Sequence, residues 1–192
     1  MNKILILLFL VCMFVTCGEV KKEEIKPDEV VEKVIFNGTF LEVLNKATEL
    51  VKAEKADAIF AEADATMKDS SMTVNDILGW KFIYWIDIQN SMIIEYKDST
   101  FSNITAMPYP ILEDYIIREP IKMDIVEAVE LMRKANYDGL IKFCTLKKPL
   151  FPGSKEPYYI FGSEKYGHIF VGTISKTVTI DKFPEEKGKK KK

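Results

Sequence analysis

The chain has 192 residues and a formal net charge of -2 at pH 7. This slightly acidic balance provides no basic surface, so nucleic-acid binding is excluded as the main function. Only Arg118 and Arg133 are arginines among the 27 basic residues, which disfavours sites that bind phosphate or carboxylate through paired hydrogen bonds. The length suffices for one domain, or for two small similar ones, with a sizeable core.

The start of the chain has the pattern of a secretory signal. Lys3 provides a positive charge, and residues 4–15 form an apolar run. Thr16 is a small residue placed directly before Cys17. About a dozen apolar residues are too few for the roughly 20 that cross a bilayer as a helix. We therefore predict a signal peptide at residues 1–16.

The residues around the cleavage point resemble the lipobox of bacterial lipoproteins. Phe14, Val15, Thr16 and Cys17 occupy its four positions, where the family pattern prefers Leu first and Ala, Gly or Ser third. The resemblance implies that Cys17 carries lipid and that the protein is anchored to a membrane by acyl chains. An ordinary secretory signal that is cut elsewhere is the alternative, and it would leave the mature protein free to diffuse.

A charged spacer and a capped helix follow the signal. Residues 17–37 are rich in Lys, Glu and Asp, as expected of a solvated linker. Thr39 and Glu42 have the spacing of a capping box and predict a helix that runs to about Ala53. We assign residues 38–106 to a first unit, in which this helix is followed by about three antiparallel strands.

A second capped helix begins at Asp124. Glu127 stands three residues later, and apolar residues at helical spacing extend the predicted helix to about Asn136. Residues 107–123 contain two prolines close together and form a connector. We assign residues 124–182 to a second unit with the same order of elements.

The two units have similar patterns. Aromatic strand-like runs at 80–85 and 157–161 are each followed by another apolar strand, which predicts a two-fold internal repeat. The Asp138-Gly139 turn, the strand at 140–146 and Tyr158-Tyr159-Ile160-Phe161 resemble PepSY-like units of bacterial envelope proteins. The resemblance implies an α+β fold of two tandem units related to the β-lactamase inhibitor protein, each a helix packed on a small antiparallel sheet. It also implies non-catalytic binding or inhibition of other proteins, and it assigns no site residues.

Few residues are candidates for catalysis. Cys144 lies in an alternating strand pattern and is predicted to be a buried structural thiol. His168 is the one histidine, and no Gly-x-Ser-x-Gly elbow or glycine-rich phosphate loop accompanies it. We therefore predict no enzyme activity, no metal site and no cofactor, and a small hydrolase that uses His168 is the catalytic alternative.

The acidic residues of the first unit are interpreted as solvated. They lack the ordered ligand spacing and the central glycine of a calcium-binding loop, so we do not assign a metal to them. These residues are Asp57, Glu62, Asp64 and Asp69.

Four aromatic residues are candidates for a binding surface. Trp80, Tyr84, Tyr158 and Tyr159 lie in strand-like runs, and exposed Trp and Tyr are favoured contact residues at interfaces. Because alternate residues of a strand point to opposite faces, some aromatic residues of these runs must fill the core. Core packing and a binding surface therefore both remain open for this group.

The sequence thus predicts a lipid-anchored protein of the bacterial cell envelope, periplasmic or surface-exposed. It is expected to bind or inhibit an envelope protein or a peptidoglycan partner without catalysis. The alternative is a structural or surface-exposed lipoprotein that acts in envelope organisation or host contact. Residues 183–192 form a basic tail, which either attracts anionic lipid headgroups or serves as a solubilising end.

Overall fold

The computed structural model describes residues 37–68, 76–149 and 156–181. All of these residues belong to the same compact unit. The predicted signal peptide, Cys17, nearly all of the linker and the basic tail lie outside the described residues, so the expectations for them stay predictions. Within the part of the chain that is described, no helix is long and apolar enough to cross a membrane.

Helix α1, Phe40–Glu54, begins where the capping box predicts. The Thr39 backbone N–H donates to Glu42 Oε2 at 2.7 Å, and the Glu42 N–H donates to Thr39 Oγ1 at 3.4 Å. These two bonds satisfy backbone donors that a helix start leaves without partners. The apolar face of the helix is buried, including Val43, Ala47 and Val51.

Helix α2, Ile125–Lys134, begins at Asp124 as predicted. One carboxylate oxygen of Asp124 accepts from the Val126 N–H at 3.1 Å, and the other accepts from the Leu41 N–H of α1 at 3.2 Å. The sequence predicts capping by Asp124 but not its bond to α1, and Glu127, expected to reach back to the cap, pairs with Lys176 Nζ at 2.6 Å. The Asp124 side chain therefore caps α2 and also satisfies a donor in the first turn of α1.

The remaining elements are strands and one short 3-10 helix, η2. The strands bury the face that meets the helices, and β2, β6 and β7 are also buried over part of their other face, so consecutive residues are buried there. In chain order the bounds are β1 Ile59–Met67, β2 Ile77–Trp85, β3 Ser91–Lys97, β4 Thr100–Phe101, β5 Thr105–Met107, η2 Glu113–Tyr115, β6 Ile141–Lys147, β7 Tyr158–Ser163, β8 Gly167–Gly172 and β9 Val178–Asp181.

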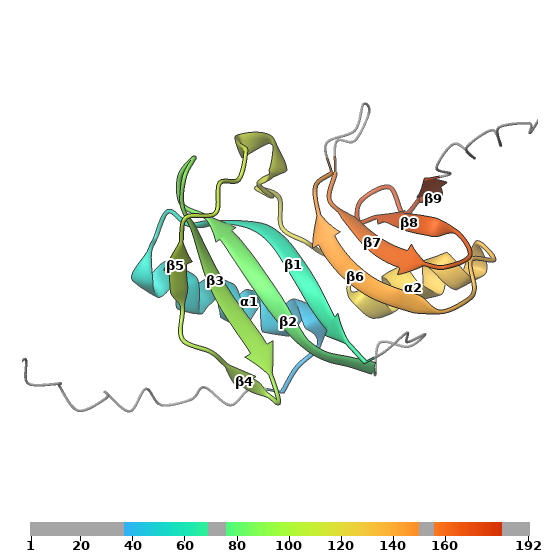
Figure 1. Ribbon diagram of the computed structural model, residues 1–192, viewed down its shortest axis with the longest axis horizontal. Coiled ribbons are helices and arrows are strands. Elements are labelled where there is room, and N and C mark those ends of the chain that lie inside the picture. The colour runs from blue at the N-terminus through green and yellow to red at the C-terminus, as the bar shows by residue number, and fades with distance from the viewer. Residues whose placement is uncertain (1–36, 69–75, 150–155, 182–192) are drawn as a thin grey trace, which may run out of the picture. The chain divides into compact units, whose positions relative to one another are not determined.

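The described strands form one antiparallel sheet (Figure 1). Their order is β4-β3-β2-β1-β6-β7-β8-β9, and β5 pairs with β3. Strands β1 and β6 pair through Glu62 with Lys147, Ala63 with Leu146 and Asp64 with Thr145. This pairing joins the part of the sheet that follows α1 to the part that follows α2.

The predicted fold class is therefore wrong. The sequence patterns indicated two tandem PepSY-like units, each with its helix on its own small sheet, whereas the described residues form a nine-stranded antiparallel sheet with two helices. The physical reason is that a strand at the edge of a small sheet exposes unpaired N–H and C=O groups. The pairing of β1 with β6 satisfies these groups, and local patterns do not report which distant strand a segment will pair with.

A shared core lies between the helices and one face of the sheet. Helix α1 passes behind β1–β3 and α2 lies behind β6–β8 in Figure 1. Both helices contribute to the same cluster of buried residues, among them Ala47 and Met132. The buried Tyr159 hydroxyl donates to the Met123 carbonyl at 2.9 Å, which ties the sheet to the segment before α2.

Candidate functional site

The candidate site lies on the face of the sheet turned away from the two helices, which we call the open face. The strand register fixes which side chains are neighbours on this face. One row of cross-strand neighbours has charged residues at its β3 end and an aromatic residue near its β9 end. In order, the row is Glu95, Lys81, Asp64, Thr145, Ile160, Phe170 and Thr179.

The middle of the open face is polar. We call Glu62, Asp64, Lys81, Thr145 and Lys147 the polar seam. Lys147 Nζ lies 3.1 Å from Glu62 Oε1, and Lys81 Nζ lies 3.2 Å from Asp64 Oδ2. The buried Thr145 hydroxyl is 2.6 Å from Asp64 Oδ1. The seam follows the pairing of β1 with β6, so these contacts exist only because the two parts of the sheet are joined.

On the β1–β3 side of the seam, part of the open face is covered. Ala61 and Ile83 pack with Ile111 and Ile116 in a buried apolar cluster. The last two belong to residues 108–117, which we call the covering segment. Its ends are held by hydrogen bonds, from the Ser91 hydroxyl to the carbonyl of residue 109 at 2.6 Å and from the N–H of residue 117 to the carbonyl of residue 60 at 2.8 Å.

A pocket of about 290 Å³ lies beside the covering segment. A second pocket, of about 540 Å³, lies elsewhere in the fold. The smaller pocket adjoins the polar seam, because Glu62 and Lys147 form part of its wall. Tyr109 and Leu112 on its rim are exposed. The lining residues are Ala61, Glu62, Tyr109, Pro110, Ile111, Leu112, Tyr115 and Lys147.

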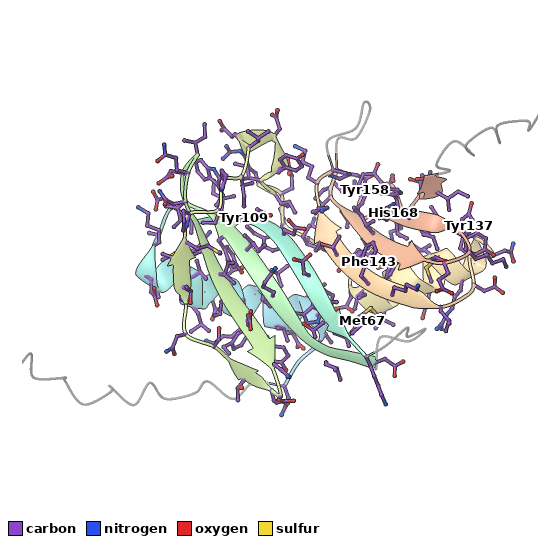
Figure 2. All side chains as sticks on the ribbon, viewed as in Figure 1. Met67, Tyr109, Tyr137, Phe143, Tyr158 and His168 are labelled. Carbon is purple, nitrogen blue, oxygen red and sulfur yellow. The ribbon has the colours of Figure 1, made fainter. Side chains whose placement is uncertain are left out.

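On the β6–β8 side of the seam, the open face is aromatic. We call Phe143, Tyr158, His168 and Phe170 the aromatic strip, and Figure 2 labels the first three on neighbouring strands. The ring centroids of Phe143 and His168 are 5.6 Å apart, and those of His168 and Phe170 are 6.2 Å apart. Tyr158 and Phe170 are 6.3 Å apart in an edge arrangement. Phe143 is 39% exposed, and the other three rings are partly exposed.

Two local features set the geometry of the aromatic strip. The Phe143 ring lies over Gly162, where a Cβ atom would collide with it. An irregularity in the pairing of β6 with β7 falls between Ile141 and Phe143. The pKa of the Tyr158 hydroxyl is raised by partial burial and then by the neighbouring Glu156 carboxylate, with which it forms a hydrogen bond.

The structure separates the four predicted surface residues. Trp80, Tyr84 and Tyr159 are buried in the core behind the sheet, so they do not form a binding surface. Tyr158 alone lies on the open face. Tyr84 and Tyr159 keep their hydroxyls bonded inside the core, which is why these polar aromatic residues can be buried.

Sequence reasoning did not include Phe143, His168 and Phe170 in the predicted binding surface. Strand alternation contains the signal, because the predicted burial of Cys144 turns both of its neighbours to the other face. Burial of Tyr159 places Tyr158 on that same face in the paired strand. The missing information was which aromatic residue of each run faces the helices.

Cys144 is buried, as predicted for a structural thiol. Burial raises the pKa of its thiol far above the ordinary value, and the Asp64 carboxylate raises it further. A thiol held in its protonated form is a poor nucleophile. His168 lies against the rings of Phe143 and Phe170, and the described residues contain no group of three side chains suited to hold a metal ion.

The chain was compared with family models, curated proteins and solved structures. No family model matches the chain, and no curated protein matches it. Among solved structures it is similar to the crystal structure of a "putative lipoprotein" from Clostridium difficile 630. The TM-score is 0.49 and the identity 16%, over 77% of this chain and 100% of that chain.

Proposed function

We propose that this chain is a lipid-anchored, non-catalytic binding protein of the bacterial envelope that holds a partner against the open face of its sheet. The anchor in this proposal is Cys17, and its support is the signal-like run that ends in a lipobox-like sequence. The observation that carries the binding role is the aromatic strip on β6, β7 and β8.

Three properties of the aromatic strip favour binding. Its rings sit on hydrogen-bonded strands, and such positions are held more rigidly than positions on loops. Aromatic rings give a large contact area at low cost in side-chain entropy. Phe143 keeps 39% of its surface exposed beside three partly exposed rings, and clustered exposed apolar surface is typical of interaction sites.

The anchor is tested by growth with labelled palmitate. We expect label on the wild-type chain and no label on Cys17→Ala, which should leave the membrane fraction. The mature chain of an ordinary secreted protein would carry no label. Label that survives in Cys17→Ala would also contradict the proposal.

The binding role is tested with purified full-length protein and isolated envelopes from cells that lack it. Loss of one anchoring ring typically costs more than 1 kcal/mol, so we expect Phe143→Ala to reduce saturable binding by about tenfold. Ile88→Ala is the matched control, because Ile88 is an exposed apolar residue in the β2–β3 turn. Equal binding by wild type and Phe143→Ala would overturn the proposal.

A further inference from the structure

Resting on the proposed function, we infer that the partner held by the open face is a neutral, hydroxyl-rich glycan chain that lies across the polar seam and the aromatic strip. The inference depends on the charge balance of the seam, on the position of the rings in the same strand rows, and on the tilt between those rings.

The charges of the polar seam are internally balanced. Its two lysines each pair with a carboxylate, Lys147 with Glu62 and Lys81 with Asp64. A charged ligand of either sign would meet a like charge beside each opposite one, so repulsion would offset its attraction to the seam. A neutral ligand has no such cost, so the seam favours an uncharged partner.

The seam nevertheless has hydrogen-bonding capacity to spare. The Lys147 side chain is 36% exposed and that of Glu62 is 19% exposed. A lysine has three N–H donors and a carboxylate has about four acceptor sites, and one ion pair uses only part of each set. Hydroxyl groups can donate to Glu62 and accept from Lys147 without separating them. This pattern suits a polyhydroxylated ligand.

The aromatic strip lies in the same cross-strand rows as the polar seam. Lys147 pairs with Tyr158, and Thr145 pairs with Ile160, which in turn pairs with Phe170. A chain that crosses the strands therefore meets hydrogen-bonding groups first and ring faces next. Sugars present the same alternation, with hydroxyl groups at the ring edge and C–H groups on the ring faces, and the latter pack against aromatic rings.

The tilt of the rings indicates a single chain. Phe143 and His168 are inclined by 56°, His168 and Phe170 by 57°, and Tyr158 and Phe170 by 83°. Rings inclined in this way do not make one flat platform for the face of a crystalline polysaccharide. They provide successive short surfaces that a bent, single glycan chain can follow. The pocket beside Tyr109 extends the surface at the seam end.

The direct test is titration of purified full-length protein, in a detergent without sugar groups, with chitohexaose and cellohexaose. We expect at least one of these neutral hexasaccharides to bind, with affinity that is insensitive to salt because no net charge is neutralised. Phe143→Ala should weaken this binding by about tenfold. No binding of either probe, or equal binding by Phe143→Ala, would overturn the inference.

Gly162→Ala is the sharper variant. The added Cβ displaces the Phe143 ring from its place over Gly162 while the ring itself is retained. We expect weaker hexasaccharide binding with near-wild-type folding, since the ring can swing towards solvent. Ile88→Ala should bind as wild type does. Wild-type affinity in Gly162→Ala would contradict the ring geometry on which the inference depends.

The envelope assay separates this inference from the proposed function. If strip-dependent binding to envelopes is removed by muramidase and resists protease, the glycan inference is supported. If it is removed by protease and resists muramidase, the partner is a protein, and the inference fails while the proposed function stands. If no binding depends on Phe143, both fail.

Discussion

The two sides of the open face differ in their side chains and in how far those side chains are buried. Next to β1–β3 the buried apolar side chains on this face are Ala61 and Ile83, and the covering segment packs on them while Trp85 is partly buried beside them. Next to β6–β8 the side chains are aromatic, and Phe143 remains 39% exposed. Burial of aliphatic groups stabilises the fold, whereas exposed rings leave apolar surface for a partner. The covered side therefore contributes to stability, and the aromatic side is the surface at which we propose binding.

The largest effect on stability is expected at the covered side. Ile83→Ala removes a fully packed side chain and should lower the free energy of unfolding by about 2–5 kcal/mol. Ile83→Val, which removes one methylene group, should cost about 0.5–1.5 kcal/mol. Urea denaturation measures both. If Ile83→Ala lowered the free energy of unfolding by less than Ile83→Val does, the covering segment would not pack as described.

A smaller loss is expected at the polar seam. Thr145→Val removes a buried hydroxyl that hydrogen-bonds to the Asp64 carboxylate, and loss of a hydrogen bond to a charged group should cost about 1–3 kcal/mol. Thr145→Ser keeps the hydroxyl and serves as the control. Hydrogen exchange at β1 and β6 should speed up in the valine variant if the seam joins the two parts of the sheet. Unchanged exchange there would contradict that role.

A still smaller effect on stability is expected at the aromatic side. Phe143→Ala should change the free energy of unfolding by about 1 kcal/mol or less, because the ring is already partly in water. The same substitution is expected to have a large effect on binding. A loss of stability as great as that of Ile83→Ala would remove the distinction between the two sides.

The smallest effect is expected at Glu156 and depends on pH. Its carboxylate accepts from the backbone N–H groups of Ile174 and Ser175, at 2.5 and 2.9 Å. Partial burial raises the pKa of Glu156, but these hydrogen bonds and one from the Ser175 side chain outweigh burial, so the net pKa is lowered. A lowered pKa in the folded state means that the ionised group stabilises the fold above its unfolded pKa of about 4.3.

Glu156→Gln should therefore lose stability relative to wild type at pH 6, and the difference should shrink as pH falls through the lowered pKa. Denaturation midpoints between pH 6 and pH 3 measure this difference. The control is Glu164→Gln, a substitution in the exposed turn between β7 and β8. If the stability difference between wild type and Glu156→Gln stayed constant with pH, the ionised carboxylate would not stabilise the turn that Glu156 contacts.

Local structure was largely predictable from the sequence. The capping residues Thr39 and Asp124 mark the starts of α1 and α2, because a cap acts on donors within a few residues of itself. The burial of Cys144 also followed from local alternation. Predictions that depend on near neighbours succeeded for this reason.

The architecture and the candidate site were not predictable in the same way. The pairing of β1 with β6 depends on backbone groups that any sequence carries, so side-chain patterns do not specify it. The choice between Tyr158 and Tyr159 for the surface depends on which face the helices cover. Both residues have the same local pattern, and only their position against the core distinguishes them.

The sequence by itself determined the helix starts, the strand-forming runs and a lipobox-like start that predicts an anchor. Only the tertiary structure decided that the strands form one sheet, that residues 108–117 cover one side of its open face, and that Phe143 and its aromatic neighbours remain at the surface of the other. Caps and alternation act through neighbours along the chain, whereas sheet pairing and burial depend on contacts between distant segments.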